Sequence, residues 1–259
     1  MAHRRFQLVV IALLVLGVCT AVLRPATVEA FGNSTAFQPR ALIVGSSQLD
    51  PIRASSLERW SAQLVARTSA PARLKAAAVR ADSSALLADP FAVWMGYTAP
   101  QPLGERELAN LRTYFAMGGV LFVDDTAPED GAFGRGARHE IGRVLPDAVP
   151  VAIGQEHVIF RSFYLVPRAV GRIEGPPKLE AIVRGGVTQV IFSSHDITGA
   201  LAQSSTEMPA FAVTPGGDSQ REMAVRLAVN IGMFVLCTNY KDDQVHAPYL
   251  MRRRSRDYR

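Results

Sequence analysis

Side chains that can bind a metal or transfer protons stand directly after apolar runs in this sequence. Asp124 and Asp125 follow the run Val120–Val123. His195 and Asp196 follow a second apolar run. A histidine beside a carboxylate can act as a general base with its orienting acid. Combined with one of the two earlier carboxylates, this pair predicts, as one hypothesis, a hydrolase that acts on glycans or peptides.

A metal-assisted version of this hydrolase needs more ligands. If Asp124, His195 and either His157 or His246 converged, two imidazoles and one carboxylate would suit a divalent transition metal with open positions for water. The sequence contains no closely spaced pair of histidines on one helical face. It therefore leaves both the metal and any cofactor unidentified.

Each of these residues also has a structural interpretation. Adjacent side chains of an extended strand point to opposite faces, so only one of Asp124 and Asp125 should face a cleft. The other one, or both, can accept backbone N–H groups of the next loop. Asp196 can cap a short helix that begins at Ile197, with His195 in the core. A further alternative is that the acids and histidines form only an internal salt-bridge network.

Other polar residues complete the set of candidates. The carboxyl ends of parallel strands meet at one edge of an α/β sheet, so we expect Ser46, Tyr97 and their neighbours to lie near the residues above. Arg161 stands among aromatic residues, where it can clamp a carboxylate or a sugar, although an internal ion pair is its simpler use. The candidate ligand-binding residues are Ser46, Tyr97, Asp125, His157, Arg161 and His246.

Apolar patterns predict the elements that position these side chains. Short apolar runs predict strands over residues 40–47, 75–79, 90–97 and 120–125. Apolar residues at helical spacing predict helices between them, at about 55–65, 105–117 and 137–145. Ser55 or Ser56 is the expected cap of the first helix, and residues 126–136 are the expected loop. This alternation predicts parallel strands joined by helical crossovers.

The second half of the chain is less regular. Residues 149–153 and 157–164 have the pattern of extended segments. The pair Gly185 and Gly186 predicts a hairpin between strands over 179–184 and 187–194. A capping box at Ser219–Glu222 predicts the start of a long helix that ends near Tyr240. That helix is apolar nearly all round, which predicts packing on both sides or against a partner.

The first 30 residues predict export. Arg4 and Arg5 precede the uncharged run Phe6–Leu23, and Val28–Ala30 has the small or apolar residues of a signal-peptide cleavage site. A cleaved signal peptide is the favoured interpretation, and an uncleaved anchor is the alternative, because a run of about 18 residues can span a bilayer. We expect a periplasmic or envelope-associated protein that contacts the membrane only through this segment.

The net charge of +5 is concentrated at the two ends of the sequence. The N-terminal 30 residues are basic, and the tail 251–259 contains five arginines against Asp257. The remainder is close to neutral, so we expect no nucleic-acid surface. We expect a single α/β domain over residues 38–250, followed by a solvated basic tail.

Four segments carry a resemblance to a known family: Gly118–Asp125, His157–Tyr164, Ser194–Asp196 and Asn239–Pro248. They resemble an uncharacterised bacterial domain-of-unknown-function family, found alone behind a signal peptide or at the end of aerotolerance-type, BatA-like membrane proteins. The order of elements is also similar to the class I glutamine amidotransferase superfamily and its trehalose-utilisation (ThuA-like) branch. The resemblance covers roughly residues 38–252 and implies export, but no known reaction.

The fold that the resemblance implies is a flavodoxin-like, three-layer α/β sandwich. Its sheet would be mostly parallel and class I glutamine amidotransferase-like, with an added β-hairpin and a long C-terminal helix. Glutaminases of this superfamily use a cysteine at a strand-to-helix elbow. Cys19 lies in the N-terminal apolar run and Cys237 in the last helix, where we expect it to behave as a small hydrophobe. Glutaminase activity is therefore not expected.

Two functional hypotheses follow from the sequence. The preferred one is an exported cell-envelope domain that binds a small polar ligand or an envelope protein partner at the strand ends. The alternative is the hydrolase that uses Asp124 or Asp125 with His195. Motifs for a serine hydrolase elbow, a phosphate-binding loop and a zinc protease are absent from the sequence.

Overall fold

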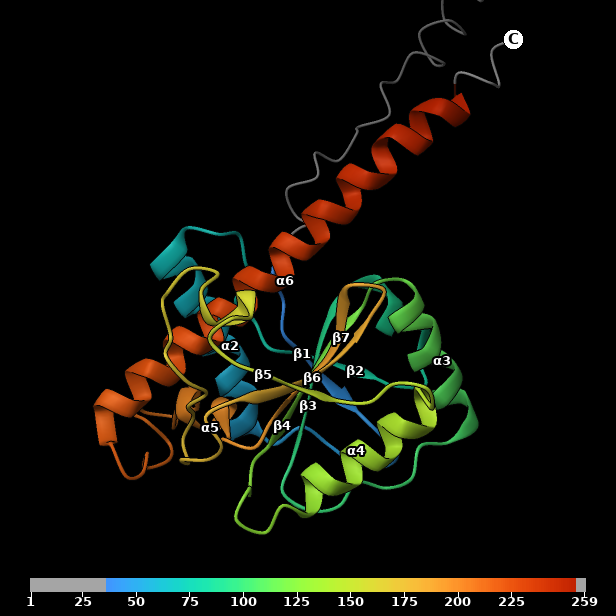
Figure 1. The fold of residues 1–259 in the computed structure, drawn as a ribbon. Helices are drawn as coiled ribbons and strands as arrows, with labels where there is room; N and C mark the ends of the chain where they lie inside the picture. The colour runs from blue at the N-terminus through green and yellow to red at the C-terminus, as the bar shows by residue number, and fades with distance from the viewer. Residues whose placement is uncertain (1–35, 255–259) are drawn as a thin grey trace, which may run out of the picture. The chain divides into compact units, whose positions relative to one another are not determined.

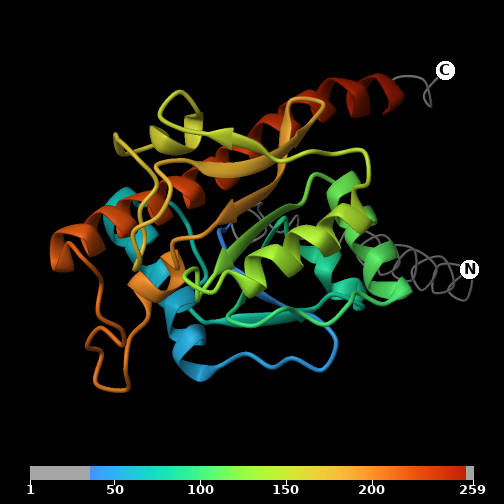
Figure 2. The same cartoon turned by 60° about the horizontal axis from the view of Figure 1, so that its bottom comes forward.

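The computed structural model describes the backbone of residues 36–254 and the side chains of residues 36–238. The described residues build a seven-stranded sheet in the order β2-β1-β3-β4-β7-β6-β5 (Figure 1). The parallel strands are β1 (Arg40–Ile43), β2 (Ala77–Arg80), β3 (Phe91–Gly96), β4 (Val120–Asp125) and β7 (Val187–Ser193). Two antiparallel strands, β6 (Leu179–Arg184) and β5 (Val151–Ile153), extend the edge opposite β2 (Figure 2).

Helices cover both faces of this sheet, as Figure 1 shows. One face packs against α2 (Pro51–Thr68), α5 (Ile197–Leu201) and α6 (Gly217–Arg254), and the other against α3 (Glu105–Ala116) and α4 (Ala132–Val144). Short 3₁₀ turns, η1 (Ser84–Ala88) and η2 (Val158–Phe160), lie in connections. The three-layer α/β fold, its mostly parallel sheet, the added hairpin and the long C-terminal helix are confirmed.

The central strand β4 is buried on both faces, which explains its unbroken apolar run. On one face Trp60 of α2 packs edge-on against Phe122 of β4, with ring centroids 5.5 Å apart. The glycine pair before the strand is also required. Gly118 has a φ of +88°, and a Cβ on Gly119 would stand 2.5 Å from the ring of Tyr114. Both positions therefore need glycine.

The structure corrects the predicted boundaries of three helices. Helix α2 begins at Pro51, and its N-cap is Asp50 instead of Ser55 or Ser56. Helix α4 begins at Ala132, inside the predicted loop, because Gly131 in a left-handed conformation (φ +66°) turns the chain into the helix. The long helix begins at Gly217, so Ser219 lies within its first turn and does not cap it, and it continues to Arg254 instead of ending near Tyr240.

The segment His157–Tyr164 is not extended as predicted, because η2 occupies its middle. A side chain from α6 determines this conformation. The amide oxygen of Asn230 accepts the backbone N–H groups of Phe163 and Tyr164 at 3.2 and 2.7 Å. Its amide nitrogen donates to the carbonyl of Tyr164 at 2.8 Å. These bonds join residues far apart in sequence, so no local pattern could have predicted them.

The described helices include none that is long and apolar enough to cross a membrane. The predicted signal peptide or anchor at residues 1–30 lies outside the described residues.

Candidate functional site

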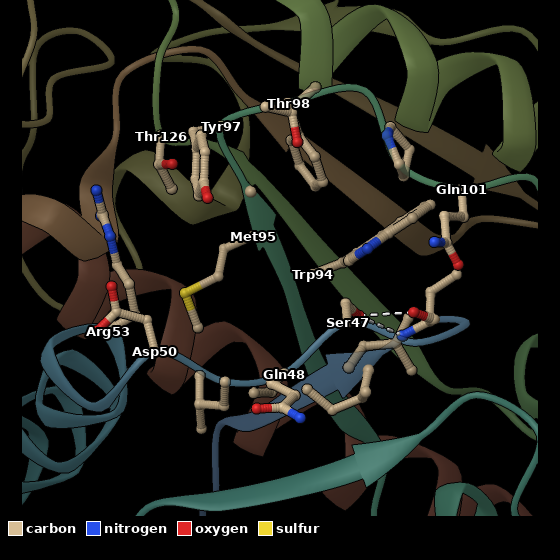
Figure 3. A pocket seen from close by; sticks show the side chains of 18 of the residues that line it. Ser47, Gln48, Asp50, Arg53, Trp94, Met95, Tyr97, Thr98, Gln101 and Thr126 are labelled. Atoms are coloured by element: carbon tan, nitrogen blue, oxygen red, sulfur yellow. Dashed lines mark hydrogen bonds between the residues drawn. The ribbon is translucent and has the colours of Figure 1, made fainter.

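A cavity of about 590 Å³ lies at the carboxyl ends of β1 and β3 (Figure 3). After β1 the chain enters α2 on one face of the sheet, and after β3 it enters α3 on the other face. The two crossovers therefore diverge at this point, which is the topological switch point of the sheet. Open α/β sheets bind their ligands in the crevice that this divergence creates.

Polar side chains surround an apolar floor in this cavity. Figure 3 shows Asp50 and Arg53 on one side and Gln101 on the other, with Trp94 and Met95 between them. The indole of Trp94 is almost fully buried and packs edge-on against a ring of α4. The predicted residues Ser46 and Tyr97 both line the cavity, and Tyr97 is 70% exposed.

The loops that form two walls are tied to each other. The amide of Gln101 donates to Ser46 Oγ at 3.0 Å and accepts the backbone N–H of Ser46 at 3.3 Å. Beneath them, the carboxylate of Glu107 accepts the N–H groups of Gly45 and Gly104 at 2.8 and 2.9 Å. One buried carboxylate thus joins the turn after β1 to the start of α3 and fixes the distance between the walls.

The first turn of α2 contributes both charged groups of the lining. Asp50 Oδ1 accepts the backbone N–H of Ile52 at 2.7 Å, as an N-cap residue does. Its other oxygen makes no hydrogen bond within the described part of the chain. Arg53 borders the cavity from the same turn of the helix and is held from behind by Asp196. Pro51 at the start of the helix fixes the backbone between the two charges.

Asp196 is a fully buried carboxylate that binds two arginines. Its Oδ1 lies 2.5 Å from Arg53 Nη1, and its Oδ2 accepts a hydrogen bond from Arg172 Nε. Both guanidinium groups also face the ring of Phe211, at 4.7 and 5.7 Å from its centroid. Asp196 caps α5 as predicted, accepting the N–H of Gly199 at 2.9 Å. It therefore positions the wall of the cavity but does not line it.

Asp124 is also fully buried and caps the same short helix. Its oxygens accept the N–H of Ile197 at 3.1 Å, the N–H of Thr198 at 2.7 Å and the hydroxyl of Thr198 at 2.8 Å. Burial, together with the nearby Asp196 carboxylate, raises the pKa of Asp124 to about 7, against the effect of these hydrogen bonds. With all three donors directed at it, this carboxylate has no free approach for a substrate.

Asp125 caps the helix on the opposite face. It accepts the N–H of Ala127 at 3.1 Å and the N–H of Gly134, in the first turn of α4, at 3.0 Å. The two adjacent aspartates therefore point to opposite faces and cap different helices. Neither of them lines the cavity, which leaves the hydrolase alternative without an assembled pair of groups among the described residues.

His195 lies in the core, behind the strand ends. Its Nε2 is 2.8 Å from the carbonyl of Pro176, its Nδ1 has no partner among the described residues, and burial lowers its pKa. Two glycines, Gly171 and Gly175, pack directly against it, and a Cβ on Gly171 would stand 2.2 Å from its carbonyl oxygen. His195 is therefore enclosed by backbone and does not contact the cavity.

The remaining candidates are not brought to the cavity. His157 caps η2 by accepting the N–H of Ile159 at 3.3 Å, and its ring packs against Phe234 of α6. Arg161 is exposed and forms no ion pair with the described residues, so the expected internal pair is wrong. The side chain of His246 lies outside the described residues. Cys237 is exposed on α6.

The described residues contain no group of three or more histidine, cysteine, aspartate or glutamate side chains placed to hold a metal ion. The sequence candidates omit most of the residues that line the cavity, including Asp50, Arg53, Gln101 and Phe211. One signal was available for the first, because an aspartate before a proline commonly marks a helix start.

Together the sheet order and the cavity define a doubly wound α/β domain with a ligand-sized crevice at its switch point. A family model matches residues 41–236, and its description is "Domain of unknown function (DUF4159)". This match covers most of the chain, which therefore belongs to the DUF4159 family. The predicted resemblance to an uncharacterised domain-of-unknown-function family is confirmed to this extent. No curated protein matches the chain.

Proposed function

We propose that this protein is an exported ligand-binding domain of the cell envelope, and that the cavity between β1 and β3 is its binding site. The observation that carries the proposal is the position of that cavity. It lies at the switch point of the sheet, has walls fixed by Glu107 and Gln101, and measures about 590 Å³. Binding sites for small molecules commonly have this size and this mixture of apolar and polar lining.

The use of the other strand-end residues supports binding over catalysis. Asp124 and Asp125 cap helices and His195 is enclosed by backbone, so none of them is available to a molecule in the cavity. A glutaminase-type cysteine is also missing from the strand ends, since Cys237 lies on α6. We therefore propose a domain that has the class I glutamine amidotransferase-like architecture but lacks its glutaminase activity.

The export part of the proposal rests on the sequence of residues 1–30. Arg4 and Arg5, the run Phe6–Leu23 and the site at Val28–Ala30 have the order of a secretion signal. Fusion of related domains to BatA-like membrane proteins would place them at the same membrane surface. A reporter enzyme active only outside the cytoplasm, fused after Arg259, should be active and should become inactive when residues 1–30 are deleted.

A thermal-shift screen of the full chain tests the binding site. We expect at least one small polar compound to raise the melting temperature of the wild type but not of Thr98→Trp. Thr98 is exposed and lines the cavity, so an indole there should fill the space without disturbing the core. Thr98→Ser is the matched control and should behave as the wild type. A compound that stabilises Thr98→Trp equally would bind elsewhere and contradict the proposal.

A further inference from the structure

We propose that the ligand of this cavity is a neutral saccharide, held by its hydroxyl groups around Asp50 and Arg53 and by one ring face against Tyr97. This inference rests on the proposed function, because it names the class of molecule that the same site would bind. Three independent properties of the lining carry it: its charge balance, its unused hydrogen-bonding groups and its exposed aromatic ring.

The charges around the cavity balance one another. Arg53 and Arg172 share the single carboxylate of Asp196, which leaves one excess positive charge beside the cavity. Asp50, which pairs with no cation in the described part of the chain, supplies the compensating negative charge at the cavity wall. An anion would meet the free carboxylate of Asp50, and a cation would meet Arg53. A neutral polar ligand fits this arrangement without an unpaired charge.

The unused polar groups match a molecule rich in hydroxyls. Asp50 offers a free carboxylate oxygen, which accepts hydrogen bonds only. Tyr97, Thr98 and Thr126 offer hydroxyls, and Gln48 a side-chain amide, none of which is bonded within the described residues. Hydroxyl and amide groups both donate and accept. A ligand must therefore present a donor to Asp50 and can present donors or acceptors to the other groups, as the hydroxyls of a sugar do, whereas the oxygens of a phosphate would meet the Asp50 carboxylate with acceptors.

Tyr97 provides the apolar surface that a sugar ring requires. Its side chain is 70% exposed although it is large and aromatic. In Figure 3 its ring stands at the rim of the cavity near Thr126, above the apolar floor formed by Met95. A pyranose ring has one face of C–H groups and an edge of hydroxyls. The C–H face can pack on Tyr97 while the edge reaches the polar groups, because tyrosine combines an apolar body with a polar end.

Titration of the full chain with defined probes tests the inference. The neutral probes are cellobiose, maltose and diacetylchitobiose. The charged probes are alanyl-alanine (a zwitterion), inorganic phosphate (an anion) and spermidine (a cation). We expect at least one neutral disaccharide to bind, measured by calorimetry and by saturation-transfer NMR, and the charged probes to bind at least about tenfold more weakly, or by about 1.4 kcal/mol.

Three variants locate the bound sugar. Tyr97→Ala should weaken saccharide binding at least about tenfold, whereas Tyr97→Phe keeps the ring and should weaken it far less. Asp50→Asn removes the charge but keeps a good helix cap, so a loss of affinity in that variant reports on the ligand and not on folding. Affinity unchanged in Tyr97→Ala would overturn the inference.

The same titrations separate this inference from the proposed function. If a charged probe binds, Thr98→Trp abolishes its binding and no saccharide binds, the saccharide class is wrong and the binding site stands. If no probe binds and no compound of the thermal-shift screen distinguishes Thr98→Trp from the wild type, both proposals fail.

Discussion

The carboxyl ends of the parallel strands are used in two opposite ways. At β4 and β7 the conspicuous groups, Asp124, Asp125 and Asp196, are buried and bonded to helix N-termini or arginines. At β1 and β3 the side chains are ordinary and the space between them stays open. Acidic residues at strand ends can therefore serve the helices that follow, while the proposed binding site is lined by groups with bonding capacity left over.

The largest effect on stability is expected for Asp196→Ala. The substitution leaves Arg53 and Arg172, whose side chains are only 14% and 20% exposed, without their shared partner. It also places alanine at a φ of +52°. We expect the free energy of unfolding to fall by about 3–5 kcal/mol, measured by urea denaturation. The control Asp50→Asn should change it by less than about 0.5 kcal/mol. If Asp196→Ala lowered the free energy of unfolding as little as Asp50→Asn does, the distinction between the two regions would be lost.

The next test uses pH and Asp124. Its pKa is raised to about 7 in the folded state from a usual value of 3.8, so folded protein keeps a proton that unfolded protein has released. This group therefore makes stability fall as the pH rises from about 4 to about 7. Asp124→Asn cannot titrate and should lose this dependence. The destabilisation caused by Asp124→Asn should be greater at pH 4.5 than at pH 7.5 in urea unfolding.

Thr198→Val is the companion variant to Asp124→Asn. It removes a hydroxyl donor that lowers the pKa of Asp124, and it keeps the carboxylate. The pH range over which stability falls should then extend upward. Identical pH profiles in the wild type and both variants would show that Asp124 does not titrate as its surroundings require.

A pair of glycines in α4 tests the cap formed by Asp125. A Cβ on Gly134 would lie 2.7 Å from Asp125 Oδ2 and would disrupt the hydrogen bond from the Gly134 N–H to that oxygen. Gly134→Ala should therefore lower the free energy of unfolding by about 1–3 kcal/mol. Gly142 is exposed in the same helix, and a Cβ there would have no neighbouring atom within 4 Å. Gly142→Ala should raise the free energy of unfolding by about 0.5–1 kcal/mol. Equal melting temperatures for the two variants would contradict the capping role.

The smallest effects on stability are expected at the cavity. Tyr97→Ala and Thr98→Ser change exposed side chains that hold no other residue, so the free energy of unfolding should change by less than about 0.5 kcal/mol. Under the proposed function, the effect of Tyr97→Ala is on ligand binding instead. If Tyr97→Ala lowered the free energy of unfolding as much as Asp196→Ala, the strand ends of β1 and β3 would share the structural role of those of β4 and β7.

Much of the fold could be predicted because its signals are local. Buried strands such as β4 are continuous apolar runs, and two glycines with positive φ mark the hairpin at Gly185 and Gly186. The prediction of an extended conformation for His157–Tyr164 was wrong because the side chain of Asn230, on a distant helix, forms hydrogen bonds with the backbone of this segment. The cavity lies at the edge of the sheet where the sequence predicts a site, but most of its lining residues could not be selected from the sequence, since the acidic and histidine side chains that indicate chemistry cap helices or lie in the core instead.

The family, most of the order of strands and helices, and the edge at which a site would lie follow from the amino-acid sequence alone, because sequence motifs and apolar periodicity are local patterns. Which side chains are already occupied depends on the folded chain. Asp124 has no free oxygen because Ile197 and Thr198, far away in the chain, donate to it, whereas Asp50 accepts only the N–H of Ile52, two residues away. Donors from distant residues reach a carboxylate only once the sheet has formed.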